Sequence, residues 1–328
     1  MKNILSYTCT EFTDQFLKGR DHARAIYSSW MRKGSVPVGE KWFREGVSRS
    51  DFWLPRIVRS WSDGGVEKLL LELHDLKRVE TVIIPMKFGF SLCVSSQVGC
   101  RMGCTFCQTG RMGLVRHLAA EEIVSQLFVA KHLVGKDIRN IVFMGMGEPF
   151  DNFDAVHQAI KIFCDPLGFG LAKRHITIST SGRLDGIERM RLEMDPAIRL
   201  ALSVNAPNDA VRKKVMPLTR KYSMGALKEG LLKYCQDPRR TLLAEYVLLK
   251  GITDSLEAAD ELADYLDGLP ARVNLIPYNP QATDRYERPD EMTLKAFKSR
   301  LQSHGLHVLL RLTKGDDIMA ACGQLGAV

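Results

Sequence analysis

Gly99-Cys100-Arg101-Met102-Gly103-Cys104-Thr105-Phe106-Cys107 is the stretch around which the chain is organised. Its three cysteines follow the pattern C-x3-C-x2-C. The stretch comes after a short apolar run, Phe90 to Val94, that predicts a β-strand, and a helical pattern starts near Ala119. The cysteines are therefore expected on a loop that leaves the end of a strand, which is where α/β enzymes place their chemistry.

Three thiolates at this spacing are soft ligands, suited to an iron–sulfur cluster or to zinc. A cubane cluster needs four ligands, so three cysteines leave one iron free to bind a substrate or cosubstrate. A zinc site needs a fourth ligand, for which His117 is the nearest candidate. Three structural thiols are a weaker alternative, because a loop offers no core to bury them. The spacing, with an aromatic residue before the last cysteine, resembles the motif of the radical S-adenosylmethionine (SAM) superfamily, whose open iron chelates SAM.

The composition is that of a large globular protein. The chain has 328 residues, 45% hydrophobic and 26% charged, which is enough to bury a core without disulfides. We expect a cytoplasmic protein with reduced thiols and no membrane association, because no secretory signal or transmembrane run is visible. The net charge of +8 favours nucleic acid as a partner, although an ordinary basic surface would give the same charge.

Residues 1–75 predict a small helical accessory domain. Residues 11–33 carry apolar side chains at helical spacing, and residues 42–61 are a second apolar and basic stretch. We expect this domain either to clamp a large RNA substrate or simply to brace the rest of the chain. A pair of short strands is predicted over residues 67–73 and 79–85.

Residues 76–312 alternate strands with helices, which predicts an α/β fold with a parallel sheet. The predicted strands are 91–96, 141–146, 175–179, 198–204, 241–248, 273–277 and 307–312, and the predicted helices are 120–133, 155–163, 184–192, 224–234, 256–265 and 293–304. Six β/α units are fewer than the eight of a closed barrel, so we expect a partial, TIM-like (β/α)6 barrel with a wide lateral mouth. Residues 313–328 form a C-terminal tail.

Polar residues follow several of these strands, at the edge where the carboxyl ends of parallel strands meet. The second strand is followed by Gly145-Met146-Gly147-Glu148-Pro149, whose glycines let the backbone approach a ligand closely. Later strands end near Ser179, Ser203 and Asn279. Each segment alone would be an ordinary polar turn. Because they converge on one mouth beside a cluster loop, together they predict a SAM site.

Two further cysteines have an unusual context. Cys93 lies on the predicted strand before the cluster loop, where a lone cysteine is usually part of the core. Cys322 lies between small residues on a glycine-bounded tail that could fold over the mouth, and its thiolate could be a nucleophile. Cys9, Cys164 and Cys235 are interpreted as structural.

The chain resembles the radical-SAM adenosine methyltransferases of ribosomal RNA, the RlmN/Cfr family. The resemblance covers roughly residues 60–326 in the same order, and is carried by Arg78 to Pro85, Leu92 to Cys100, Phe143 to Pro149, Gly168 to Leu171 with Thr177 to Gly182, Val273 to Pro280, and Gly315 to Ile318 with Ala320 to Leu325. The combination of Cys93, the cluster motif and the tail Ala-Cys-Gly-Gln is highly specific.

The resemblance implies which residues hold the cofactors. Cys100, Cys104 and Cys107 would bind a 4Fe–4S cluster. The SAM contacts would be Gly147, Glu148, Ser179, Ser203, Asn205 and Asn279. The family usually has histidine where this chain has Asn205. An amide still donates and accepts hydrogen bonds but cannot be protonated, so an acid–base role at this position is in doubt.

The resemblance also implies a mechanism that uses two SAM molecules per turnover. Cys322 would accept a methyl group from the first and become S-methylcysteine. A radical made from the second would remove a hydrogen from that methyl, which then adds to the adenine ring. Cys93 would remove the ring proton and form a disulfide with Cys322. Glu80 matches a residue that acts as a proton acceptor in the family, and orienting the base by hydrogen bonding is the alternative role.

The expected function is methylation of an adenosine, with carbon 2 favoured, in large-subunit ribosomal RNA, and transfer RNA is a second candidate substrate. An electron donor such as flavodoxin and a monomeric state are also expected. Adenine carbon 8, another radical-SAM substrate and a zinc-stabilised RNA-binding protein are the alternatives. Four basic pairs are candidates for phosphate contacts: Lys173-Arg174, Lys213-Lys214, Arg220-Lys221 and Arg239-Arg240.

Overall fold

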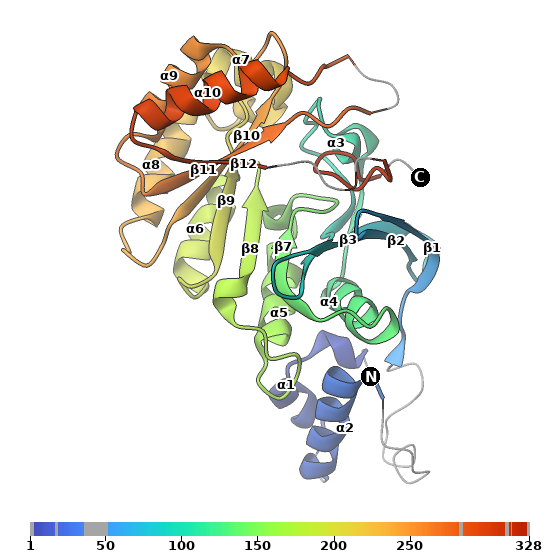
Figure 1. Ribbon diagram of the computed structural model, residues 1–328. Coiled ribbons are helices and arrows are strands. Elements are labelled where there is room, and N and C mark those ends of the chain that lie inside the picture. Colours follow the sequence, from blue (N-terminus) through green and yellow to red (C-terminus); the bar gives the residue numbers. More distant parts are fainter. Residues whose placement is uncertain are drawn as a thin grey trace.

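The computed structural model describes residues 3–16, 19–35, 52–281, 285–311, 315 and 317–326. Figure 1 shows the arrangement of its elements. The strands are β1 (Arg56–Asp63), β2 (Val66–Glu72), β3 (Arg78–Pro85), β4 (Phe90–Cys93), β5 (Gln97–Cys100), β6 (Gly113–His117), β7 (Ile138–Phe143), β8 (Ile176–Thr180), β9 (Arg199–Ser203), β10 (Leu242–Leu248), β11 (Ala271–Pro277) and β12 (His307–Leu310). The α-helices are α1 (Cys9–Thr13), α2 (Arg20–Lys33), α3 (Gln108–Met112), α4 (Ala120–Phe128), α5 (Phe153–Cys164), α6 (Leu184–Glu193), α7 (Asp209–Val215), α8 (Met224–Tyr234), α9 (Leu256–Leu266) and α10 (Glu291–Ser303).

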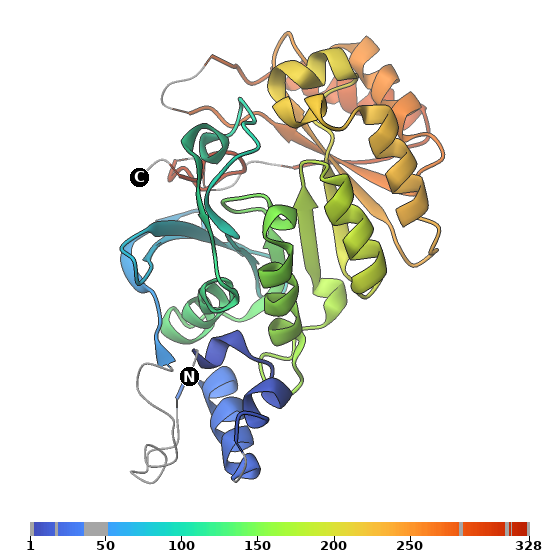
Figure 2. The ribbon, with the colours of Figure 1, turned by 180° about the vertical axis from the view of Figure 1, so that it is seen from behind.

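The main sheet is curved and open. Among the described residues it has ten strands in the order β1-β2-β3-β4-β7-β8-β9-β10-β11-β12, and all neighbours from β4 to β12 are parallel. Helices cover its outer face, as Figures 1 and 2 show from opposite sides. The prediction of an α/β fold with a partial parallel barrel and N-terminal helices is confirmed, and the carboxyl ends of the parallel strands lie along one edge.

The sheet extends further toward the N-terminus than the sequence indicated. β1 and β2 fall within the stretch assigned to the accessory domain, yet β1 pairs with β2, β2 with β3 and β3 with β4, all antiparallel. Most side chains of β1 are exposed, so the strand lacks the alternation of buried and exposed residues that would have revealed it. Residues 36–51, which include the first half of the predicted stretch 42–61, lie outside the described residues.

The cysteine loop has its own small framework instead of being a plain connection. β5 pairs antiparallel with β6, so Cys100 ends a strand and Cys107 directly precedes α3. Gly99 has a φ of +75°, and a Cβ there would lie 1.9 Å from the carbonyl oxygen of Gly113. Only glycine fits that position, and the close approach it permits fixes the turn that presents Cys100.

Several outer helices begin at side chains that cap their first turn. Ser223, Ser255 and Asp290 accept hydrogen bonds from the backbone N–H groups three residues later, at 3.2, 3.1 and 2.7 Å. The predicted helix 120–133 is α4 followed by a turn of π-helix over Val129–Leu133. None of the helices in the described ranges combines the length and apolar character needed to span a membrane.

The N-terminal helices dock on α4 and on the loop after α5. The Trp30 ring stacks on Phe128 with centroids 4.5 Å apart. Asp165 accepts hydrogen bonds from the backbone N–H of Cys9 at 2.5 Å and the hydroxyl of Tyr27 at 3.2 Å. Figures 1 and 2 place α1 and α2 at the end of the molecule opposite α3 and the C-terminal tail.

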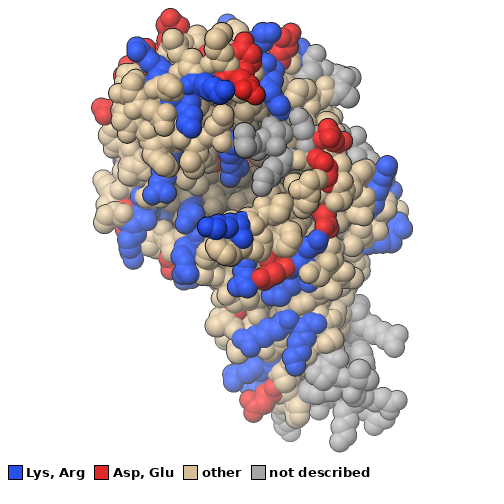
Figure 3. Space-filling model, in the orientation of Figure 1, with Lys and Arg blue, Asp and Glu red and all other residues tan. Residues whose placement is uncertain are grey.

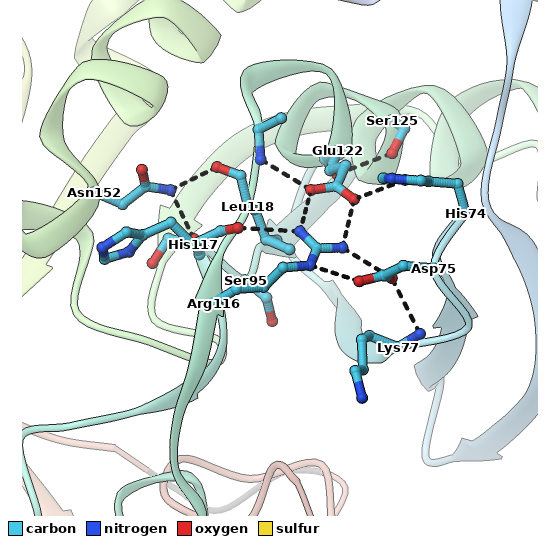
Figure 4. Close-up of polar contacts among 12 residues, drawn as sticks. His74, Asp75, Lys77, Ser95, Arg116, His117, Leu118, Glu122, Ser125 and Asn152 are labelled. Carbon is cyan, nitrogen blue, oxygen red and sulfur yellow. Dashed lines mark hydrogen bonds and ion pairs between the residues drawn. The ribbon is translucent and has the colours of Figure 1, made fainter.

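A network centred on Arg116 joins the β2–β3 hairpin to α4 (Figure 4). The Arg116 guanidinium donates to both oxygens of buried Glu122 at 2.7 and 2.8 Å, and to both oxygens of Asp75 at 3.0 and 2.8 Å. Glu122 also accepts from the backbone N–H of Ala119 at 2.9 Å, and His74 lies 3.4 Å away. Since Asp75 and His74 belong to the turn after β2, the network fixes the position of the hairpin relative to the barrel.

Candidate active site

A cavity of about 160 Å³ lies at the carboxyl ends of the parallel strands. The three cysteines of the motif line one side of it. The strand ends line the other side, including every residue that the sequence predicted to contact SAM: Gly147, Glu148, Ser179, Ser203, Asn205 and Asn279. The structure therefore brings two separately predicted groups of residues to one place, because parallel strands end on the same edge of a sheet.

Cys100 is buried, and Cys104 and Cys107 are half-buried. Burial raises the pKa of Cys100 to about 12, and it also raises the pKa values of Cys104 and Cys107. The neighbouring thiols raise the pKa of Cys104 further, while backbone N–H groups of Gly110 and Thr109 favour the thiolate of Cys107. Three thiolates at this site therefore need a cationic partner, which the iron atoms of a cluster provide.

His117, the candidate fourth ligand of a zinc site, does not lie with the three cysteines. His117 lies on β6, with its Nδ1 2.9 Å from Nε2 of Gln97, and it does not line the cavity. In the described part of the chain, no group of three or more His, Cys, Asp or Glu side chains is arranged to hold one metal ion. A cubane cluster does not require such a group, because each thiolate binds a different iron atom.

The glycine-rich turn after β7 is held in place by close packing at Gly147 and by hydrogen bonds to Glu148. Gly147 has a φ of +107°, and a Cβ there would lie 2.7 Å from the side chain of Gln97, so the position requires glycine. Glu148 accepts hydrogen bonds from the backbone N–H and hydroxyl of Ser181, both at 2.8 Å, and from the N–H of Phe150 at 3.2 Å. Burial raises the pKa of Glu148, and these donors oppose the rise.

Asn205 serves the structure of the cavity wall. It has a left-handed φ of +54°, which asparagine tolerates better than most residues. Its Oδ1 accepts from the backbone N–H of Val247 at 3.0 Å, which continues the β9–β10 pairing by one side-chain bond, and its Nδ2 lies 3.5 Å from the sulfur of Met216. The residue lines the cavity, but its carbonyl oxygen already has a partner.

Glu245 is a cavity residue that the sequence reasoning missed. It lies on β10, is 4% exposed, and accepts from Nδ2 of Asn274 at 2.8 Å through one oxygen. Burial raises its pKa, and Arg311 opposes the rise. The available signal was a single carboxylate in the otherwise apolar strand Leu242–Leu248.

A second cavity, of about 580 Å³, adjoins the first. Cys93 and Cys322 both line it, and Cys322 also lines the first cavity. The two cavities share Met144, Ile276, Asn279 and Cys322, which form the wall between them. Burial, together with the nearby Cys322, raises the pKa of Cys93 to about 12. The structure thus places both cysteines at one cavity although they are far apart in the sequence. Cys9 is buried in the core, and Cys164 and Cys235 pack against it.

The C-terminal tail is held between the cysteine loop and the loop after β11. Gly323 O accepts from the backbone N–H of Gln108 at 2.7 Å and from Nε2 of Gln281 at 3.0 Å, and Leu325 O accepts from the hydroxyl of Thr109 at 2.6 Å. Asn279 donates to the carbonyl oxygen of Cys322 at 3.0 Å. These bonds hold the Cys322 side chain at the wall between the cavities, and Figure 1 shows the tail beside α3.

Glu80 lies apart from the other predicted site residues. It is 1% exposed, lines neither cavity, and forms an ion pair with Lys68 at 3.1 Å. Its other oxygen accepts from the backbone N–H of Gly326. Glu80 therefore contacts the tail.

Comparison with known proteins gives a consistent result. The family model of the Radical SAM superfamily matches residues 94–266. The chain is 45% identical over 335 residues to the probable dual-specificity RNA methyltransferase RlmN 1 of Protochlamydia amoebophila, covering 99% of this chain and 94% of the relative. It is 48% identical over 263 residues to the dual-specificity RNA methyltransferase RlmN of Halorhodospira halophila, covering 80% and 73%.

A solved structure agrees over the whole chain. The crystal structure of a radical SAM methyltransferase from Sphaerobacter thermophilus matches with a TM-score of 0.94 and 35% identity, covering 100% of both chains. The resemblance noted in the sequence is confirmed: the chain belongs to the radical SAM superfamily and, within it, to the family of RlmN-type RNA methyltransferases.

Proposed function

We propose that this enzyme methylates carbon 2 of an adenosine in large-subunit ribosomal RNA, with transfer RNA as a second substrate. The observation that carries the proposal is the place of Cys322 in the wall between a cavity lined by the cysteine motif and a cavity lined by Cys93. A methyl carrier has to face both its source and its acceptor. The relatives named RlmN favour carbon 2 over carbon 8.

The cofactors are a 4Fe–4S cluster and SAM. Carbon 2 of adenine is an electron-poor ring carbon, so ordinary polar methyl transfer from SAM to it does not work. The bound cofactors supply a 5′-deoxyadenosyl radical by reductive cleavage of SAM. Cys100, Cys104 and Cys107 would hold the cluster, and the strand ends around Gly147 and Glu148 would hold SAM at its open iron.

Cys322 and Cys93 have complementary tasks in this proposal. The Cys322 sulfur takes a methyl group and presents it toward the second cavity, where the adenine ring lies. Cys93 removes the ring proton at the site of addition. The adduct radical would return one electron to the cluster. The deprotonated Cys93 sulfur then bonds to the Cys322 sulfur, the electron pair of the bond between that sulfur and the methylene carbon passes to the carbon, and the carbon takes up a proton to become the methyl group of the released RNA.

The second cavity fits a base taken out of the RNA stack. Its volume of about 580 Å³ has room for a purine nucleoside, and Ser91, Asn140 and Lys87 add polar groups to a largely apolar wall. One chain forms both cavities, which supports a monomer as the active unit.

Cleavage of SAM needs one electron from outside the chain, for which we propose a carrier such as flavodoxin. We also propose that this enzyme is cytoplasmic, because both its RNA substrate and its thiolate-ligated cluster fit that compartment.

The regiochemistry is tested with RNA that carries deuterium at carbon 2 of the target adenine. Methylation should remove that label, as mass spectrometry of the digested RNA would show. Retention of the carbon-2 label in methylated product, with loss of a carbon-8 label in a parallel reaction, would reassign the enzyme to carbon 8.

The two cysteine roles are tested in the same assay. Cys322→Ala should abolish methylation while SAM is still cleaved, and Cys93→Ala should trap the protein covalently on RNA. Cys164→Ala is the matched control, since this half-buried thiol lines neither cavity, and it should methylate normally. Normal turnover by Cys93→Ala would contradict the proposed release step.

A further inference from the structure

A buried ion pair lies beneath the C-terminal tail. Lys68 projects from β2 and Glu80 from β3, their charged atoms are 3.1 Å apart, and the side chains are 2% and 1% exposed. The Lys68 ammonium also lies 4.6 Å from the centre of the Trp61 ring, so an aromatic face shields it from solvent. Neither charged residue lines either of the two cavities described above.

Both members of the pair bond to the tail, one on each side of Cys322. The Lys68 ammonium donates to the carbonyl oxygen of Met319 at 3.2 Å. The backbone N–H of Gly326 donates to Oε2 of Glu80 at 2.5 Å. Both bonds are charge-assisted and partly buried, which makes them stronger than bonds between neutral groups.

The backbone at these two points is unusual and needs support. Met319 has a φ of +51°, a left-handed conformation that is strained for a methionine, and Gly326 has a φ of +99°. The bonds from Gln108, Thr109 and Gln281 act on Gly323 and Leu325, whereas Lys68 holds the segment that precedes Cys322. The tail is therefore held at Met319, before Cys322, and at Gly326, after it.

A buried ion pair is a poor source of net stability, because apolar residues of the same size often do as well. It is useful where a defined geometry matters. We propose that the Lys68–Glu80 pair is a positioning device for Cys322, holding the tail so that the methyl-bearing sulfur stays in the wall between the cavities. The inference rests on the proposed function of Cys322, and it makes Glu80 a positioning residue that acts through the tail.

The test uses the double variant Lys68→Met/Glu80→Gln, which removes both charges without leaving one of them buried and unpaired. Glu67→Gln is the matched control. Glu67 is the neighbour of Lys68 on β2, so its side chain points to the opposite face of the strand, and its carboxylate pairs with Lys136. Hydrogen–deuterium exchange of residues 317–326 is followed by mass spectrometry in the reconstituted enzyme without RNA.

Tail amides of the double variant should exchange at least about tenfold faster than those of the wild type. The control should match the wild type, and peptides from β8 and β9 should stay protected in every variant, which shows that the fold is intact. Unchanged tail protection in the double variant would overturn the proposal. This readout does not depend on methylation, so it decides the point even if the RNA substrate has been assigned wrongly.

A second readout is the number of 5′-deoxyadenosine molecules formed per methylated adenosine. A loosened tail should raise this ratio, because the radical forms while the methyl group is out of place. Glu80→Gln alone keeps an acceptor for Gly326 and should lie between the wild type and the double variant in both readouts. If Glu80→Gln abolished methylation with a fully protected tail, Glu80 would act on the RNA base and the positioning role would be wrong.

Discussion

Arg311 is a cationic side chain beside the thiol of Cys322. It lines the second cavity, and its guanidinium lies 3.9 Å from the sulfur of Met144. Burial alone would lower the pKa of Arg311, but Glu245, Cys322 and Cys93 outweigh burial and raise it. Cys322 is exposed at the wall between the cavities, yet the protein around its sulfur disfavours the thiolate and raises its pKa, and Arg311 opposes that rise. Since only the thiolate attacks a methyl group, Arg311 is expected to set the pH at which Cys322 becomes methylated.

Arg311→Met should shift the first methyl transfer to higher pH. Without the guanidinium the pKa of Cys322 rises further, so less thiolate is present at any pH below that pKa. Each unit of upward shift lowers the rate there about tenfold. Mass spectrometry of the Cys322 peptide in single-turnover reactions across a pH series measures the effect. Arg272→Met, on the exposed start of β11, is the control. Superimposable profiles for Arg311→Met and the wild type would contradict the assigned contact.

The sequence predicted some site residues and missed others for a physical reason. Residues at strand ends, such as Glu148 and Ser203, were predictable because the carboxyl ends of parallel strands always meet. Glu245 and Arg311 were not, because their use depends on strand register and on where the tail docks. Glu80 was recognised as important, but its contact with Gly326 follows only from the folded chain.

The network centred on Arg116 joins the β2–β3 hairpin to α4 and so fixes the strands that carry Lys68 and Glu80. Arg116 pairs at once with Glu122 on the helix and Asp75 on the turn (Figure 4). Arg116 and neighbouring donors hold the pKa of Asp75 down at about 2, so the pair persists across the physiological pH range.

Arg116→Met should lower the free energy of unfolding by about 2–4 kcal/mol, because it leaves buried Glu122 with only its weaker partners. Chemical unfolding measures the change. Arg139→Met is the comparison, since the pair between Arg139 and Asp137 is exposed on both sides and should contribute less than about 1 kcal/mol. Equal effects of the two substitutions would mean that the network around Glu122 contributes no more than a surface pair.

At the scale of elements, periodicity succeeded where one face of a strand or helix is buried. The parallel strands from β4 to β12 were all predicted, as were the helices α4, α5, α6, α8, α9 and α10, with ends shifted by a few residues, whereas the short helix α7 was not. The sequence did not reveal β1 because most of its side chains are exposed. It did not reveal β5 and β6 because both contain glycine and polar residues and lack the apolar run that marks a buried strand.

The basic pairs of the sequence lie at two different edges of the barrel. Lys213-Lys214 and Arg220-Lys221 are exposed on α7 and the turn after it, beyond the carboxyl end of β9, and flank Met216 of the first cavity. Lys173-Arg174 and Arg239-Arg240 precede β8 and β10 at the opposite edge, where Lys173 pairs with Asp195 and Arg240 is buried. Figure 3 shows Lys and Arg spread over one face of the molecule, so position rather than number distinguishes the pairs.

Replacing Lys213, Lys214, Arg220 and Lys221 with glutamine should weaken RNA binding. Each phosphate contact that is lost should reduce the slope of log affinity against log salt by about 0.7–0.9. Binding titrations at several salt concentrations give the slope. The variant Lys173→Gln/Arg174→Gln should keep the wild-type slope. If Lys173→Gln/Arg174→Gln reduced the slope more than the fourfold variant did, the RNA would have to run over the opposite edge of the barrel.

The N-terminal helices α1 and α2 lie far from both cavities. They dock at the end of the molecule opposite the tail and pack on α4 through Trp30 and Phe128. This position favours bracing of the barrel over direct contact with the base in the second cavity. Sequence periodicity predicted α2 but not its docking surface, because docking depends on the tertiary partner Asp165.

The wall of Met144, Ile276, Asn279 and Cys322 has a consequence for inhibitor design. Fragments found separately for the two cavities can be joined only across this wall, and the Cys322 thiol is a natural attachment point that an electrophile can reach from either side. A fragment anchored in the second cavity would draw its selectivity from the residues that we propose contact the RNA base. If Cys322 carries the methyl group as proposed, loss of the thiol would not be a route to a resistant enzyme, because the same substitution would remove the methyl carrier.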